Sequence, residues 1–148
     1  MQGQKIVITH IKADFDAISS AWAACRLYEC DAIWICTEME QNVHSYIKTI
    51  DHSIIKQVKP KDIEEISEIE HLIITDCKQK KRLGKLAALV DKAKRISIFD
   101  HHPAYAKDID GEEEVIEELG SSLTILVKLL MAAGKTISPE ESSMYMLG

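Results

Sequence analysis

Three short runs rich in apolar, β-branched residues constrain the fold most. They are residues 5–9 (KIVIT), 71–75 (HLIIT) and 95–99 (RISIF). The first run has no alternation of polar and apolar residues, which is typical of a central parallel strand buried on both faces. Each run stops abruptly at a histidine or an aspartate. The sequence therefore predicts an α/β fold in three layers, with a mainly parallel central sheet.

The segments between these runs have the apolar spacing of helices. Residues 17–28 are rich in Ala, and apolar side chains recur at helical spacing from residue 83 to residue 93. Further strands are predicted at residues 31–36, 54–58 and 115–119, and further helices at 38–50, 60–67, 122–133 and 139–147. Because strands alternate with helices throughout, we expect helices on both faces of the sheet.

Composition excludes several classes of protein. The chain has 148 residues, 46% hydrophobic and 28% charged, and a net charge of −6, which does not indicate a broad nucleic-acid-binding face. It contains neither an apolar run of about 18–20 residues nor a signal peptide, so we expect a soluble, cytoplasmic domain with no membrane contact. Glycine-rich nucleotide-binding loops are absent, and the four cysteines lack metal-site spacing and are expected to be buried free thiols.

Metal-ligand residues follow each of the three runs. They are His10 with Asp14 and Asp16, then Asp76, and then Asp100 with His101 and His102. Parallel strands end at one edge of a sheet, and carboxylates gathered there repel one another unless a cation is present. Mixed imidazole and carboxylate ligands suit Mn²⁺, Fe²⁺, Co²⁺ or Zn²⁺, and a carboxylate between two such ions can bridge them. The pattern predicts a two-metal hydrolase, although each residue alone could be a helix cap, a turn or a solvated loop.

The same residues resemble a known family. The motifs THIKADFDA, ITD, DHH and GSSLT are similar, in order and spacing, to those of the DHH phosphoesterase superfamily, and they span nearly the whole chain. That superfamily includes RecJ-like exonucleases, oligoribonucleases and manganese-dependent pyrophosphatases. The forms ADFDA and DHHP most resemble the subgroup in which a DHH domain is fused to CBS and tRNA nucleotidyltransferase domains.

The resemblance implies roles for particular residues. It assigns a first metal to His10, Asp14 and Asp76, and a second to Asp16, Asp76 and His101, so that Asp76 is the bridge. It places His102 beside the substrate phosphate, with Asp100 orienting the histidine pair. Three hydroxyl groups near a helix start could contact phosphate or simply cap the helix: Ser121, Ser122 and Thr124. A basic run at residues 78–82 could steer a phosphate backbone or be a solvated loop.

The implied activity is hydrolysis of a phosphoester bond. We expect Mn²⁺ as the metal, with Mg²⁺ or Co²⁺ as alternatives, and a nucleotide, a short oligonucleotide or RNA, or another phosphorylated small molecule as the substrate. The alternative is a non-catalytic or regulatory DHH module of a larger tRNA nucleotidyltransferase-like protein. An inorganic pyrophosphatase is less favoured, because the ADFDA and DHHP forms indicate the other branch.

The family pattern continues past the residues given. The family has a further aspartate shortly after a Leu-Gly pair such as Leu147-Gly148, and a smaller C-terminal substrate-binding domain. We therefore expect residues 1–148 to be a single DHH domain, truncated at its C-terminus and fused to further domains in the full-length protein. Its first metal site would be complete and its second would lack one ligand. Association into a homodimer is left open.

Overall fold

One fully parallel sheet organises the part of the chain that the structure describes. The computed structural model describes residues 3–50, 53–103 and 107–148. The strands are β1 (Lys5–Ile8), β2 (Ala32–Ile35), β3 (Ile55–Gln57), β4 (His71–Thr75), β5 (Ile96–Asp100) and β6 (Glu113–Ile116). Their spatial order is β3-β2-β1-β4-β5-β6, and every neighbouring pair is parallel. The predicted parallel sheet is confirmed.

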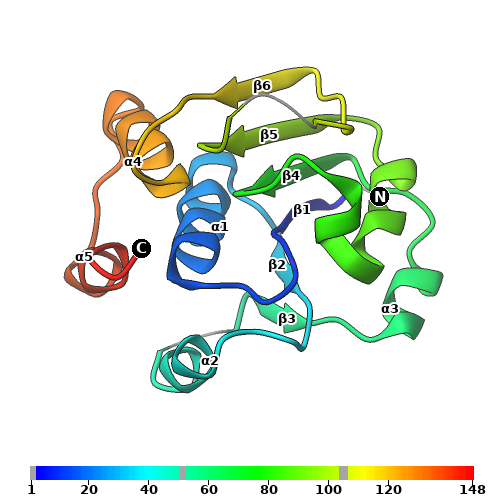
Figure 1. Ribbon diagram of the computed structural model, residues 1–148, viewed down its shortest axis with the longest axis horizontal. Coiled ribbons are helices and arrows are strands. Elements are labelled where there is room, and N and C mark those ends of the chain that lie inside the picture. Colours follow the sequence, from blue (N-terminus) through cyan, green and yellow to red (C-terminus); the bar gives the residue numbers. More distant parts are fainter. Residues whose placement is uncertain (1–2, 51–52, 104–106) are drawn as a thin grey trace.

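Helices cover both faces of this sheet (Figure 1). On one face lie α1 (Phe15–Tyr28), α2 (Gln41–Ile47), α4 (Ser122–Ala132) and α5 (Pro139–Tyr145). The other face is covered by α3 (Pro60–Glu65) and by η1 (Lys80–Lys92), a 3₁₀ segment. The three-layer α/β fold is therefore as the sequence predicted.

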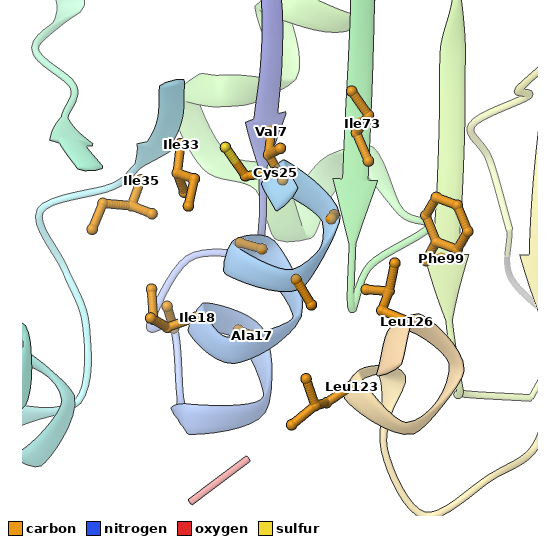
Figure 2. Close-up of a cluster of buried hydrophobic side chains, with 14 of the residues drawn as sticks. Val7, Ala17, Ile18, Cys25, Ile33, Ile35, Ile73, Phe99, Leu123 and Leu126 are labelled. Atoms are coloured by element: carbon orange, nitrogen blue, oxygen red, sulfur yellow. The ribbon is translucent and has the colours of Figure 1, made fainter. Parts of the chain in front are cut away.

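The core consists of two apolar layers separated by the sheet. Val7, Ile73 and Phe99 point toward α1 and α4, as Figure 2 shows. Ile8 and Ile74, the next residues along β1 and β4, point to the opposite side, toward η1. Successive strand residues face opposite sides of a sheet, so a strand that is buried on both faces is apolar at most of its positions. This burial accounts for the apolar residues 6–8 of β1 and 72–74 of β4.

The connections leave β1 and β4 in opposite directions. The chain passes from β1 through α1 to β2, whereas it passes from β4 through η1 to β5 on the other side. Because α1 and η1 lie on opposite faces, the carboxyl ends of β1 and β4 form the switch point of the sheet. In open α/β sheets this is the position at which ligands bind.

Among the elements whose form or bounds differ from those predicted, two are informative. The segment expected to be a regular crossover helix is a 3₁₀ segment interrupted at Gly84, where φ is +57° and ψ is −133°. A Cβ atom on Gly84 would lie 2.5 Å from Cγ2 of Ile11, so the loop after β1 packs directly on this glycine. The last strand spans Glu113–Ile116 rather than residues 115–119, and within it Val115 pairs with Phe99 of β5. Acidic and apolar residues alternate in both ranges, so the alternation alone does not decide where the strand begins and ends.

Glu141 ties α5 to α1 and provides a test of this packing. Its carboxylate accepts hydrogen bonds from Arg26, from Nε1 of Trp22 at 3.3 Å and from the backbone N–H of Ser138 at 2.8 Å. Burial raises the pKa of Glu141, but these three donors outweigh burial and hold the pKa below its usual value. The charged form therefore stabilises the fold above the ordinary glutamate pKa, and this contribution is lost as the pH falls through the lower folded value.

We expect Glu141→Gln to lower the free energy of unfolding by about 1–3 kcal/mol at pH 7, since it weakens hydrogen bonds to a charged acceptor. The difference from the unchanged chain should shrink as the pH falls below about 4.3, where the unfolded carboxylate takes up a proton. Urea unfolding between pH 7 and pH 3 measures both the loss of free energy of unfolding and its dependence on pH. Glu140→Gln, at the exposed neighbouring position, is the matched control and should leave stability nearly unchanged. A difference that grows on acidification would contradict the assigned sign.

Candidate metal centre

The predicted ligand residues lie at the carboxyl ends of β1, β4 and β5, which are neighbours in the sheet. The ends of β1 and β4 are joined by side-chain bonds, since the Thr9 hydroxyl donates to the Thr75 carbonyl at 2.9 Å. The backbone N–H of Asp76 donates to the carbonyl of Phe99 in β5 at 2.8 Å. These contacts fix the points from which His10, Asp76 and Asp100 project.

The loop between β1 and α1 is held from both sides. The Ile11 N–H donates to the carbonyl of Arg82 at 2.8 Å, and the Lys12 N–H donates to the carbonyl of Glu38 at 2.9 Å. The loop then reaches Asp14, whose Oδ1 accepts from the backbone N–H of Ala17 at 2.9 Å and caps α1. Of the two aspartates in this loop and the first turn of the helix, Asp14 is therefore the cap.

Asp76 lies at the centre of the cluster. Its carboxylate is buried between two histidines, with Oδ2 3.1 Å from Nε2 of His10 and Oδ1 3.3 Å from Nε2 of His101. The hydroxyl of Ser122 donates to Oδ1 at 2.9 Å. The backbone φ of Asp76 is +57°, a left-handed conformation that costs energy outside glycine and that often occurs at functional sites. One carboxylate therefore faces both imidazoles.

Backbone carbonyls orient both rings. Nδ1 of His10 is 2.6 Å from the carbonyl oxygen of Ile11, and Nδ1 of His101 is 3.1 Å from that of Leu119. Because a carbonyl oxygen can only accept, each Nδ1 carries the hydrogen. Nε2 of each ring is turned toward Asp76 and is the atom that would bind a metal ion. This is the usual arrangement of histidines that bind metals.

Two groups of side chains, among the described residues, are close enough to share a metal ion. The ligand atoms lie within 4.8 Å of one another in the group of His10, Asp14 and Asp76, and likewise in the group of Asp76, His101 and His102. Asp76 belongs to both groups. The donors are imidazole nitrogens and carboxylate oxygens, which fit Mn²⁺, Fe²⁺, Co²⁺ or Zn²⁺. The first group contains the three residues assigned to the first metal, and their role as ligands remains a prediction.

Asp16 belongs to neither group within the described parts of the chain. Its carboxylate accepts from the backbone N–H of Ser122 at 3.1 Å and of Leu123 at 3.0 Å, so it binds the N-terminus of α4. Its Oδ2 is 3.4 Å from Nε2 of His101. Asp16 therefore lies beside the predicted second site while its oxygens are engaged by the helix.

The electrostatics of the cluster favour a cation. Burial and the neighbouring negative charge of Asp76 raise the pKa of Asp16. Burial also acts to raise the pKa of Asp76, but the hydrogen bond and charge of His10 outweigh it and hold that pKa low. Two carboxylates side by side repel each other, and a bound divalent cation relieves this repulsion.

Asp100 orients the second histidine of the DHH motif. Its Oδ1 lies 2.6 Å from Nδ1 of His102 and also accepts from the backbone N–H of His101 at 3.0 Å. Its Oδ2 receives the ammonium group of Lys78 at 2.5 Å. Lys78 also donates to the carbonyl of His102 at 3.0 Å and is only 4% exposed.

Lys78 is the residue that sequence reasoning missed. The basic run offered a choice between steering a phosphate and lying in a solvated loop, and Lys78 does neither, because it is paired with a buried carboxylate. Beside this pair is a cavity of about 170 Å³ that is lined by Arg82, His102 and Pro103 as well as by Lys78 and Asp100. The side chain of His102 is 40% exposed.

The three hydroxyl residues have separate positions. Ser121 caps α4, since its Oγ accepts from the backbone N–H of Thr124 at 3.2 Å, and Ser122 contacts Asp76. Thr124 is exposed and its hydroxyl is 3.0 Å from Oγ of Ser121. Of the two roles considered for these hydroxyls, capping is the one that Ser121 has. The contact of Ser122 with Asp76 had no signal in the sequence.

In the residues described, no helix is both long and apolar enough to cross a membrane.

Comparisons with known proteins agree with the motifs. The curated A-adding tRNA nucleotidyltransferase of Geobacter sulfurreducens is 31% identical over 146 residues, which are 97% of this chain and 16% of that protein. The A-adding tRNA nucleotidyltransferase of Aquifex aeolicus is 25% identical with the same coverage. This chain thus spans about a sixth of the length of these relatives.

A solved structure shares the fold. The exopolyphosphatase-related protein from Bacteroides fragilis superposes with a TM-score of 0.80 over 99% of this chain and 45% of that chain, at 18% identity. The family model described as the DHH family, N-terminal domain, matches residues 4–148. Together with the cluster at the ends of β1, β4 and β5, this match shows that the chain belongs to the DHH family and is an N-terminal domain of that family.

Proposed function

We propose that this domain hydrolyses phosphoester bonds in nucleotides or short oligonucleotides, with two Mn²⁺ ions as cofactors. The observation that carries the proposal is the position of Asp76, whose two oxygens face His10 and His101 and which belongs to both ligand groups. A carboxylate in that position is suited to bridge two ions. Membership of the DHH family supports phosphoester chemistry in particular.

The proposed ligand sets are the two implied by the motifs. His10, Asp14 and Asp76 hold one ion, and Asp16, Asp76 and His101 hold the other. When bound, such ions stabilise the charge on the phosphoryl oxygens and activate water. Asp100 forms a hydrogen bond with Nδ1 of His102 and thereby fixes the orientation of the ring. The other ring nitrogen, Nε2, is then left to contact the phosphoryl group.

We further propose that the active protein is longer than this chain and works in the cytoplasm. The curated relatives extend well beyond the matched 146 residues, and the described cysteines are free thiols. In such a longer protein, a further domain would form a second wall beside the metal centre and could add a ligand to the second metal. The substrate class, with RNA among the candidates, depends on that second wall.

Activity of the full-length protein tests the proposal. With Mn²⁺, it should shorten a labelled oligonucleotide of a few nucleotides, and a chelator should stop the reaction. Asp76→Asn should lower the rate by about 100-fold or more, because it removes the shared ligand. Asp91→Asn is the matched control, since Asp91 is exposed and pairs only with Lys80 among the described contacts. Equal rates for the two variants, or no metal-dependent cleavage, would overturn the proposal.

A second candidate is favoured by the names of the relatives. In a larger tRNA nucleotidyltransferase-like protein, this domain would bind RNA or regulate the catalytic domain without hydrolysis. In that case, Asp76→Asn would leave full-length nucleotidyl transfer and tRNA affinity intact, and the unchanged protein would not degrade oligonucleotides. Release of phosphate from pyrophosphate would instead point to a pyrophosphatase.

A further inference from the structure

We propose that Cys25 and Cys30 form a reversible dithiol–disulfide pair, a redox modification site at the end of α1 that is remote from the metal centre. Asp14 and Asp16 lie at the N-terminal end of α1, whereas Cys25 lies in its last turn and Cys30 follows the residue that caps its C-terminus. Neither cysteine contributes to the ligand groups of the described residues.

The way in which α1 ends brings the two cysteines together. Glu29 adopts the left-handed conformation, with φ of 53° and ψ of 56°, and its N–H donates to the carbonyl of Cys25. The N–H of Cys30 donates to the same carbonyl at 3.0 Å. In this type of helix ending, the side chain after the left-handed residue folds back onto the last turn, where an apolar contact is usual. Here that contact is made by two thiols.

The sulfur atoms are close in this arrangement. The Cys25 thiol donates to the carbonyl oxygen of Cys30 at 3.6 Å, and the two thiols also interact with each other. The hydrogen bond between the thiols lowers the pKa of Cys25 and raises that of Cys30. A thiolate is the form that attacks an oxidant, and the partner thiol lies within reach to complete the bond.

The remaining two cysteines act as internal controls. Cys36 follows β2 and Cys77 follows β4, and these strands are separated by β1, a gap of about 10 Å that a disulfide cannot span. Both are buried, and burial raises the pKa of each thiol, that of Cys77 to about 11. Cys25 is buried as well, but its neighbour Cys30 is only partly buried, so a small oxidant would reach the pair past Cys30.

The reaction balances with a peroxide as the oxidant. The Cys25 thiolate attacks one oxygen, the O–O bond breaks, and a sulfenic acid forms on Cys25 while the other oxygen leaves as water after taking a proton. The Cys30 sulfur then attacks the Cys25 sulfur, and the S–OH oxygen leaves as a second water. Two thiols lose two electrons and two protons in total, and the peroxide is reduced. A dithiol reductant reverses the change.

Mapping of the oxidised chain tests the proposal without relying on a variant. After treatment with stoichiometric hydrogen peroxide, we expect the number of free thiols to fall from four to two and the mass to fall by two hydrogen atoms. Trypsin cuts after Arg26 and an aspartate-specific protease cuts before Asp31, so a bond between Cys25 and Cys30 joins two peptides that would otherwise separate. Dithiothreitol should restore all four thiols.

Single substitutions provide the matched comparison. Cys25→Ser and Cys30→Ser should each abolish the intramolecular bond, whereas Cys36→Ser and Cys77→Ser should still lose two thiols on oxidation. Thermal melting of each reduced variant establishes that it is folded. A bond that joins another pair or two chains, a sulfinic acid on a single cysteine, or four thiols that survive the peroxide would overturn the proposal.

Discussion

Lys78→Met is expected to lower the free energy of unfolding by about 3–5 kcal/mol. The substitution keeps the length of the side chain but removes the ammonium group that lies 2.5 Å from Oδ2 of Asp100. Asp100 is 1% exposed, so its charge would then be buried without a cation beside it. Removal of one partner of a buried ion pair costs far more than the pair itself contributes.

Equilibrium unfolding in urea measures this loss. Lys80→Met is the matched control, because it makes the same change two residues along the chain in an exposed pair with Asp91. Exposed pairs contribute about 0–1 kcal/mol, so the control should be close to the unchanged chain. If both variants unfolded at the same urea concentration, the pair between Lys78 and Asp100 would not stabilise the loop after β4.

Mn²⁺ is expected to stabilise the chain, and Asp76→Asn is expected to remove that effect. An ion that binds only the folded chain adds about 2.7 kcal/mol at a concentration 100 times its dissociation constant. For a domain of this size this corresponds to a rise in Tm of roughly 5–10 °C. Asn preserves the shape of the side chain and tolerates the left-handed backbone at this position, where φ is +57°.

The measurement is a thermal melt over a series of Mn²⁺ concentrations. Asp91→Asn should retain the full rise in Tm, since its side chain is exposed and lies outside both ligand groups of the described residues. An equal rise in Asp76→Asn would mean that the ion binds elsewhere. Mg²⁺ in place of Mn²⁺ should give a smaller rise, because imidazole ligands suit Mn²⁺ better.

The fold was predictable because burial restricts which residue types a strand can carry. Strands β1 and β4 are covered on both faces, and the central residues of both are accordingly apolar. The 3₁₀ form of η1 was not predictable, because leucines at positions 83, 86 and 89 fit an α-helix equally well. What interrupts the segment is the close approach of Ile11, a contact between residues distant in sequence.

The candidate site was predictable as a location more than as a set of contacts. Ligand types that recur at strand ends indicated one edge of the sheet, and the structure brings His10, Asp76 and His101 together there. The donors that surround them were not evident. The hydroxyl of Ser122 and the ammonium of Lys78 reach their carboxylates from other elements, and such pairings depend on tertiary packing.

The capping of α4 by Asp16 has a thermodynamic consequence. This carboxylate receives the first N–H groups of α4, which carry partial positive charge, and an ion in the second position would draw on the same oxygens. The N–H groups and the ion would share the negative charge of one carboxylate, so each would weaken the interaction of the other with it. Binding of an ion at that proposed position and order in the first turn of α4 would therefore be coupled with negative sign, and the coupling would be reciprocal. Whatever stiffens the start of α4 would then lower the affinity for that ion.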